Sequence, residues 1–78
     1  MTQTDFGEFS SEIRRLVTVF RLKASPAEIN QLIDAYFHAL QRFTVFQLIA
    51  ATDTWIAREA KFPKPAELAS VVPRRTAD

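Results

Sequence analysis

Apolar residues recur at spacings of three and four over the first third of the chain, which is the pattern of a buried stripe on an amphipathic helix. The stripe consists of Phe6, Phe9, Ile13, Leu16, Val17 and Phe20. It predicts a helix over residues 6–23. Because proline disfavours the helical conformation of the residue before it, this helix is expected to end ahead of Pro26.

The same segment carries the start signals of a second helix. Ser25 can cap its N-terminus, Pro26 suits the first helical position, and Glu28 completes a Ser-x-x-Glu capping box. These signals predict a helix over residues 26–42. Its apolar stripe consists of Ile29, Leu32, Ile33, Tyr36, Phe37 and Leu40.

A second capping box, formed by Thr44 and Gln47, predicts a third helix over residues 45–61. Its apolar stripe consists of Val45, Leu48, Ile49, Thr52, Ile56 and Ala60, with Phe46 and Trp55 at the edge of that stripe.

Two prolines interrupt the chain in the segment 61–65. They remove amide donors and favour extended geometry in their neighbours, so this segment is expected to form a stiff corner. Pro65 is suited to begin a short fourth helix of residues 66–71 or 66–72, and Pro73 is expected to end it.

No segment alternates at period two for long enough to form a strand. The predicted fold class is therefore all-α, a small bundle of three long helices plus a short C-terminal helix. With 78 residues, the chain is expected to form a single helical domain over residues 1–73, followed by a flexible basic tail over residues 74–78. It contains no cysteine for disulfides, but seven phenylalanines, one tyrosine and one tryptophan can supply a well-packed core.

The residue types that catalysis requires are sparse. The one histidine, His38, lies one helical turn after Asp34, which predicts a solvated side-chain pair because no nucleophile completes a catalytic set. Glu8 and Glu12 are interpreted as a solvated acidic face. One glycine cannot form a phosphate-binding loop, and the absence of cysteine excludes a thiolate-held zinc. The protein is therefore not expected to be an enzyme, and no catalytic residue, metal or cofactor is assigned.

Charge is balanced overall and uneven along the chain. The formal net charge is +1, from ten basic and nine acidic residues. No base precedes Arg14, whereas the C-terminal third is mildly basic. This balance is too even to predict nucleic-acid binding by the whole chain. No secretory leader or membrane-spanning apolar run is present in the sequence, so the expected location is the cytoplasm, with no membrane partner.

Two aromatic residues near the third helix have open roles. Trp55 lies one position off the main stripe and Phe62 lies in the proline corner. They are expected either to pack against each other or to form a small exposed anchor of the kind found in interface hot spots.

The order of these elements resembles a known family. A tyrosine in an apolar helix, Tyr36-Phe37-His38-Ala39-Leu40, is followed by a helix with central aromatic residues and by Ala60-Lys61-Phe62-Pro63-Lys64-Pro65-Ala66-Glu67-Leu68. Over residues 25–72 this resembles the N-terminal helical domain of the phage replicative-helicase loader and inhibitor family, whose final helix follows a Phe-Pro-x-Pro-x-Glu-like corner.

The resemblance implies a protein that binds the hexameric replicative helicase, holds it inactive and helps to deliver it to an origin-bound initiator. Family members carry a long flexible C-terminal extension that engages the helicase, whereas this sequence ends six residues after Val72. What the resemblance still implies without that extension is a compact binding module that occupies a helicase or another replication protein and blocks it. No catalytic residue carries over from the family. The residues that carry over as architecture are Phe62, Pro63, Pro65, Glu67 and Leu68.

The leading hypothesis is thus a non-catalytic protein-binding module, a phage-type replicative helicase loader or inhibitor acting in DNA replication. The candidate partner-binding residues are Trp55 and Phe62 as anchors and Arg74 and Arg75 as pairs for acidic groups. The alternative is a small helical DNA-binding regulator that uses the scattered arginines. A third hypothesis is a self-associating protein whose first helix packs against its own copy.

Overall fold

The computed structural model describes residues 1–73 as a set of short, closely packed helices. A 3-10 helix, η1 (Gln3–Asp5), leads into α1 (Phe6–Val19). Then follow α2 (Pro26–Leu40), α3 (Val45–Arg58) and the short α4 (Pro65–Ser70). The predicted all-α fold, with three long helices and a short C-terminal one, is confirmed. The predicted tail, residues 74–78, lies outside the described residues.

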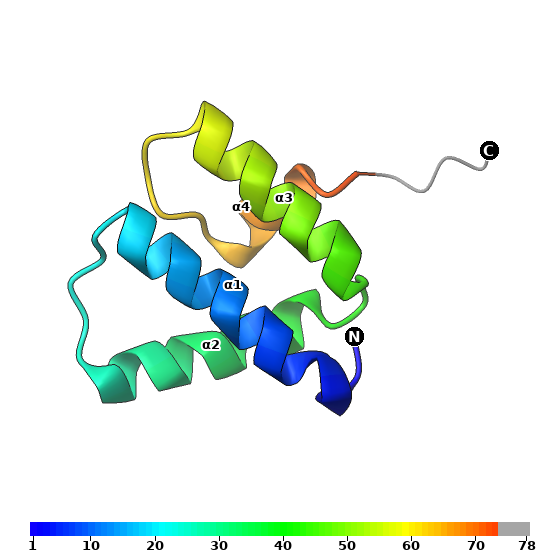
Figure 1. The fold of residues 1–78 in the computed structure, drawn as a ribbon, viewed down its shortest axis with the longest axis horizontal. Coiled ribbons are helices and arrows are strands. Elements are labelled where there is room, and N and C mark those ends of the chain that lie inside the picture. Colours follow the sequence, from blue (N-terminus) through cyan, green and yellow to red (C-terminus); the bar gives the residue numbers. More distant parts are fainter. Residues whose placement is uncertain (74–78) are drawn as a thin grey trace.

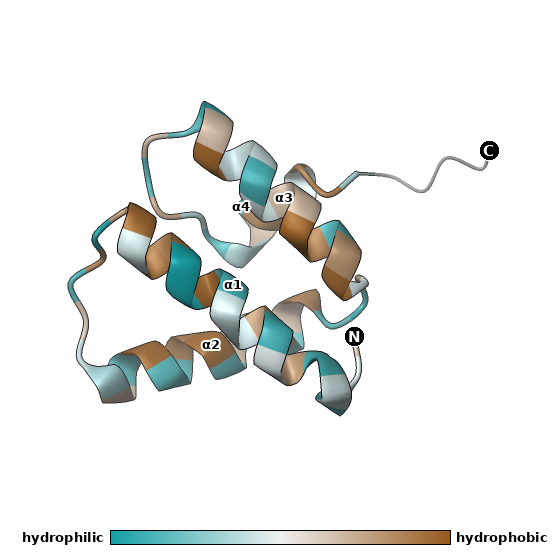
Figure 2. Cartoon of the chain, viewed as in Figure 1, coloured by the Kyte–Doolittle hydropathy of each residue, from teal (hydrophilic) through white to brown (hydrophobic). Residues whose placement is uncertain are grey.

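The helices form a bundle in which α1 packs against both α2 and α3 (Figure 1). α1 and α3 run in the same general direction, α2 crosses on the other side of α1, and α4 packs against α2 and α3. Hydrophobic and hydrophilic positions alternate around each helix, as the stripes predicted (Figure 2). The largest fully buried apolar side chains come from all four α-helices: Phe9, Ile13, Leu16, Ile33, Leu40, Leu48 and Leu68.

Both capping boxes form as predicted. The Ser25 hydroxyl accepts the Glu28 amide at 3.2 Å, and the Glu28 carboxylate accepts the Ser25 amide at 2.8 Å. Thr44 and Gln47 make the equivalent pair of bonds at 3.1 and 2.9 Å. Each box supplies acceptors for amide groups that have no partner within the helix, so these local signals define where α2 and α3 begin.

The predicted C-terminal boundaries of the first three helices were too long. α1 ends at Val19 instead of 23, because the amide of Leu22 donates to the carbonyl of Val17 and the amide of Arg21 donates to that of Thr18. This pair of bonds is a Schellman motif, and it reverses the chain direction. α2 ends at Leu40 instead of 42, where the Phe43 amide bonds the Leu40 carbonyl.

α3 ends three residues before its predicted limit, because Glu59 adopts an extended conformation with φ of −117° and ψ of 156°. α4 begins at Pro65 and ends at Ser70, so it is shorter than the predicted limit of 71 or 72.

Arg21 holds the left-handed position of the Schellman motif, with φ of 50°. Glycine is the usual residue there, since a side chain in this conformation costs about 1–2 kcal/mol. Arg21→Gly is therefore expected to raise the free energy of unfolding by about 0.5–1 kcal/mol, after the extra backbone entropy of glycine is subtracted. Urea denaturation followed by circular dichroism measures this change. Lys23→Gly is the matched control and is expected to leave stability unchanged or lower it; an equal gain in both variants would contradict the assignment.

Candidate functional site

Two aromatic side chains hold the proline corner from inside the bundle. The Tyr36 hydroxyl of α2 donates to the Pro63 carbonyl at 2.6 Å. The indole N–H of Trp55, on α3, donates to the Lys61 carbonyl at 2.7 Å. Both carbonyls lie between α3 and α4, where no helix supplies them with an amide partner, so the two side-chain bonds fix the corner. The corner is thereby tied to both α2 and α3.

A salt bridge ties the outside of the same corner to α4. The Glu67 carboxylate accepts the Lys64 amide at 2.9 Å and lies 2.8 Å from the Lys61 ammonium. Hydrogen bonding from Lys61, and secondly from the Lys64 amide, lowers the pKa of Glu67. The bond between Lys61 and Glu67 also raises the pKa of Lys61. Burial, and secondarily the charge of Glu67, raises the pKa of Tyr36. Tyr36 therefore stays protonated and able to donate at neutral pH.

The structure decides between the two roles left open for Trp55, packing and an exposed anchor. Its side chain is 5% exposed and belongs to the core cluster, so the hypothesis of an exposed anchor is wrong for this residue. The indole can be buried because its N–H donates to the Lys61 carbonyl of the corner. Phe62 is half-buried against this core, with its ring centroid 6.1 Å from that of Tyr36, and its part in binding stays a prediction. Arg74 and Arg75 lie outside the described residues.

Phe46 is the large apolar side chain with the greatest exposure in residues 1–73. It is 78% exposed on the first turn of α3, compared with 46% for Val19. Its neighbour Val45 is buried, and consecutive helical residues point about 100° apart, so the two side chains leave the helix in different directions. Sequence reasoning placed Phe46 at the edge of the stripe without making it a site. Phe46 shares a helix face with Ala50 and Asp53, and this spacing was the signal that could have placed it on the outer face of α3.

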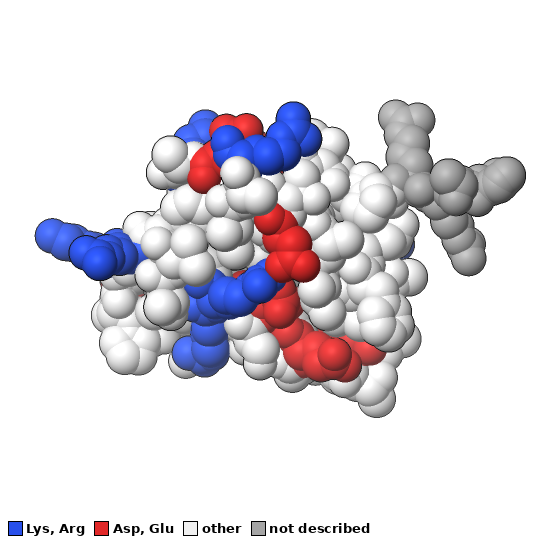
Figure 3. All heavy atoms as spheres, turned by 45° about the horizontal axis from the view of Figure 1, so that its top comes forward, with Lys and Arg blue, Asp and Glu red and all other residues white. Residues whose placement is uncertain are grey.

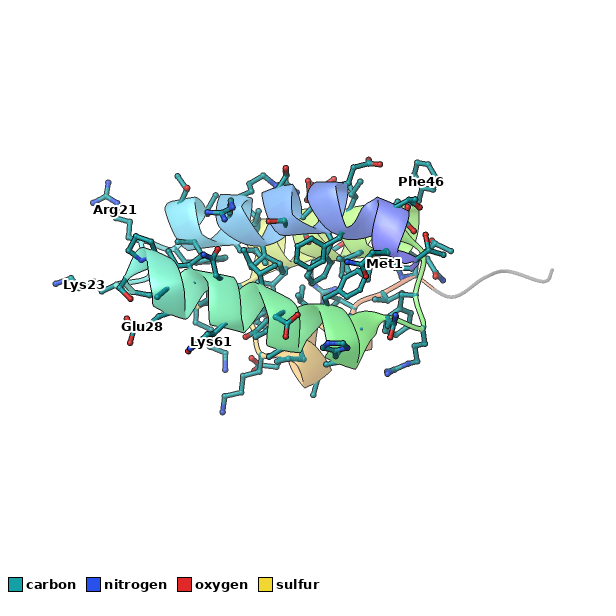
Figure 4. All side chains as sticks on the ribbon, turned by 90° about the horizontal axis from the view of Figure 1, so that it is seen from below. Met1, Arg21, Lys23, Glu28, Phe46 and Lys61 are labelled. Atoms are coloured by element: carbon teal, nitrogen blue, oxygen red, sulfur yellow. The ribbon has the colours of Figure 1, made fainter. Side chains whose placement is uncertain are left out.

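The residues of α3 around Phe46 are uncharged. Residues 45–52 contain no acidic or basic side chain, and Ile49 and Ala50 are half-buried beside the exposed ring. Figure 4 shows Phe46 pointing away from the bundle, at the end opposite Arg21 and Lys23. Together, Phe46, Ile49 and Ala50 form a small apolar surface, named here the Phe46 surface.

An ion-pair network closes the seam between α1 and α3. The Arg15 guanidinium lies 2.8 Å from Glu12 and 2.6 Å from Asp53. Hydrogen bonding to Asp53, together with the charges of both carboxylates, raises the pKa of Arg15. Acidic side chains form a band across this side of the molecule, and Lys and Arg side chains lie at its upper end, beside its middle and at the left of the view (Figure 3).

A shallow groove of about 320 Å³ lies between α2 and α4. Its lining consists of Ala39, Leu40, Arg42, Pro65, Ala66 and Ala69. One guanidinium among small apolar groups provides no nucleophile or general base, so this groove has no chemistry of its own.

The remaining polar candidates are solvated. His38 Nε2 lies 3.7 Å from Asp34 Oδ1 and both side chains are about two thirds exposed, 69% and 68%, which matches the solvated pair that the spacing predicted. In the part of the chain that the structure describes, no group of three His, Cys, Asp or Glu side chains is placed to hold a metal ion. None of the helices within residues 1–73 has the length and apolarity needed to cross a bilayer.

Comparison with known proteins adds no relative. No family model matches the chain, and no curated protein or solved structure is significantly similar to it.

Proposed function

We propose that this chain is a non-catalytic protein-binding module, a phage-type replicative helicase loader or inhibitor that acts in DNA replication. The observation that carries the binding role is Phe46, a phenylalanine left 78% exposed in a bundle whose other Phe, Tyr and Trp side chains are buried or half-buried. Exposing an aromatic ring costs about 25 cal/mol for each Å² of apolar surface. A partner that covers the ring recovers this free energy, and aromatic residues are frequent in interface hot spots.

The proline corner supports the more specific part of the proposal. The resemblance carries Phe62, Pro63 and Glu67 over as architecture, and here Glu67 caps α4 through the Lys64 amide while the Pro63 carbonyl is anchored to α2. The corner therefore holds α4 in place, because a helix of this length is not stable alone. A fixed α4 is what a rigid binding module requires.

DNA binding has less support. Arg15 is engaged by two carboxylates, Lys61 by Glu67, and Arg14 donates to Asn30 at 3.1 Å. Phosphate binding requires several bases that are free to replace counterions on one face. Among residues 1–73, these three bases already have partners.

The test is capture from a bacterial lysate on the immobilised protein at two salt concentrations, with nuclease treatment and mass spectrometry. A replicative helicase is expected to be retained at high salt. Phe46→Ala is expected to weaken its binding about tenfold or more, as for a hot-spot aromatic residue. Val19→Ala, which removes the other exposed apolar side chain, is the matched control and is expected to bind like the original chain.

Recovery of nucleic acid alone, lost at high salt, would favour the DNA-binding alternative. Equal retention by the Phe46→Ala variant would contradict the role of the Phe46 surface. Self-association is measured on the same samples by sedimentation, where a mass that rises with concentration and depends on Phe46 would assign the surface to a second copy of the chain.

A further inference from the structure

Among the described residues, the edge of the Phe46 surface that faces α1 carries negative charge, whereas the Met1 ammonium and Arg42 lie on the side of the α2–α3 loop. The ion pair between Arg15 and Asp53 joins α1 to α3. The two helices run in the same general direction, so residues at equal distances before this pair lie at similar heights (Figure 1). Seven residues earlier, almost two full turns, α1 presents Glu8 and α3 presents Phe46. Both side chains are exposed and lie on the same faces of their helices as the ion pair. Glu8 is therefore placed beside the seam on the side that carries Phe46.

No Lys or Arg side chain lies in the N-terminal part of α1, and the Met1 ammonium is bonded to the Gln41 and Phe43 carbonyls of the α2–α3 loop. The residues before Arg14 include Asp5, Glu8 and Glu12 and no Lys or Arg. The guanidinium of Arg15 is already bonded to Glu12 and to the α3 carboxylate across the seam. The Phe46 surface is thus apolar at its centre and acidic along the edge that faces α1.

Resting on the function proposed above, we infer that the Phe46 surface binds a basic amphipathic segment of the partner protein, with an apolar side chain over Phe46 and Lys or Arg toward Glu8. Charge complementarity selects this occupant. An acidic segment would place like charges together, which disfavours wrong partners, whereas a basic one is steered toward the surface and is held at high salt by the apolar contact with Phe46. The sequence predicted that Arg74 and Arg75 bind acidic groups of the partner. The segment inferred here, which binds the Phe46 surface, is basic instead.

The experiment is a selection of random peptides displayed on filamentous phage, with the folded chain as bait and the Phe46→Ala variant as the counter-selection bait. Enriched peptides are expected to combine a net positive charge with apolar residues spaced by three or four. Synthetic copies of these peptides are expected to bind the chain and to bind Glu8→Gln about fivefold more weakly, the range of one exposed charge pair. Asp34→Asn, on the outer face of α2, is the matched charge control and is expected to have no effect.

The outcomes separate the two proposals. Enriched peptides that need Phe46 but are neutral or acidic would overturn the basic occupant and leave the protein-binding function intact. Basic peptides that bind Phe46→Ala equally well, or that lose as much affinity on Asp34→Asn as on Glu8→Gln, would also overturn it, because their binding would be nonspecific charge attraction. Enrichment that never depends on Phe46 would overturn the role of the Phe46 surface, whereas the protein-binding function itself would be overturned only if the lysate capture retained no protein. Circular dichroism of each bait checks that the variants are folded.

Discussion

Trp55→Ala is expected to lower the free energy of unfolding by about 3–5 kcal/mol, the range for truncating a buried aromatic side chain. The indole is 5% exposed, packs in the core and bonds the Lys61 carbonyl. Since a domain of this size has about 4–12 kcal/mol of stability in total, much of it would be lost. Urea denaturation followed by far-ultraviolet circular dichroism measures the change.

A second variant separates packing from hydrogen bonding. Trp55→Phe keeps most of the ring but leaves the Lys61 carbonyl without its indole donor, so a loss of about 1–3 kcal/mol is expected. Phe46→Ala is the exposed control, and its stability is expected to change by less than about 0.5 kcal/mol. If Trp55→Ala were as stable as Phe46→Ala, the core position of Trp55 would be disproved.

Tyr36→Phe is expected to cost about 1–3 kcal/mol, since it leaves the Pro63 carbonyl without its donor inside a partly buried corner. The aromatic ring is retained, so its packing against Phe62 is preserved and the loss reports on the hydroxyl. The same urea denaturation measures this loss. Because the corner is then tied only through Trp55 and the Lys61–Glu67 ion pair, we also expect it to open locally.

Limited trypsin digestion detects that opening. Cleavage after Lys61 is expected to become faster in Tyr36→Phe, whereas cleavage after Lys23, in the loop between α1 and α2, serves as the internal control and is expected to stay the same. Equal acceleration at both sites would indicate global destabilisation and would contradict a specific role for Tyr36 in the corner.

The candidate site was harder to predict than the helices. Trp55 and Phe46 both lay at the edge of the third stripe, and periodicity ranks them equally. Their burial differs for two reasons. The indole N–H of Trp55 donates to a carbonyl of the corner, whereas no element within the described residues packs over Phe46 on the first turn of α3. The first reason depends on the conformation of the segment after α3, and the second depends on where the other helices lie, so a pattern read along one helix contains neither.

Local chemistry in the sequence determined the helical class, the order of the helices and the starts of α2 and α3, because caps and prolines act within a few residues. The end of α1 was less visible, since it depends on Arg21 adopting a conformation that glycine usually fills. Only the tertiary structure decided which aromatic residues are buried and that the acidic start of α1 lies beside α3. Burial and charge neighbourhood arise from contacts between helices, and these form only when the stripes are packed together.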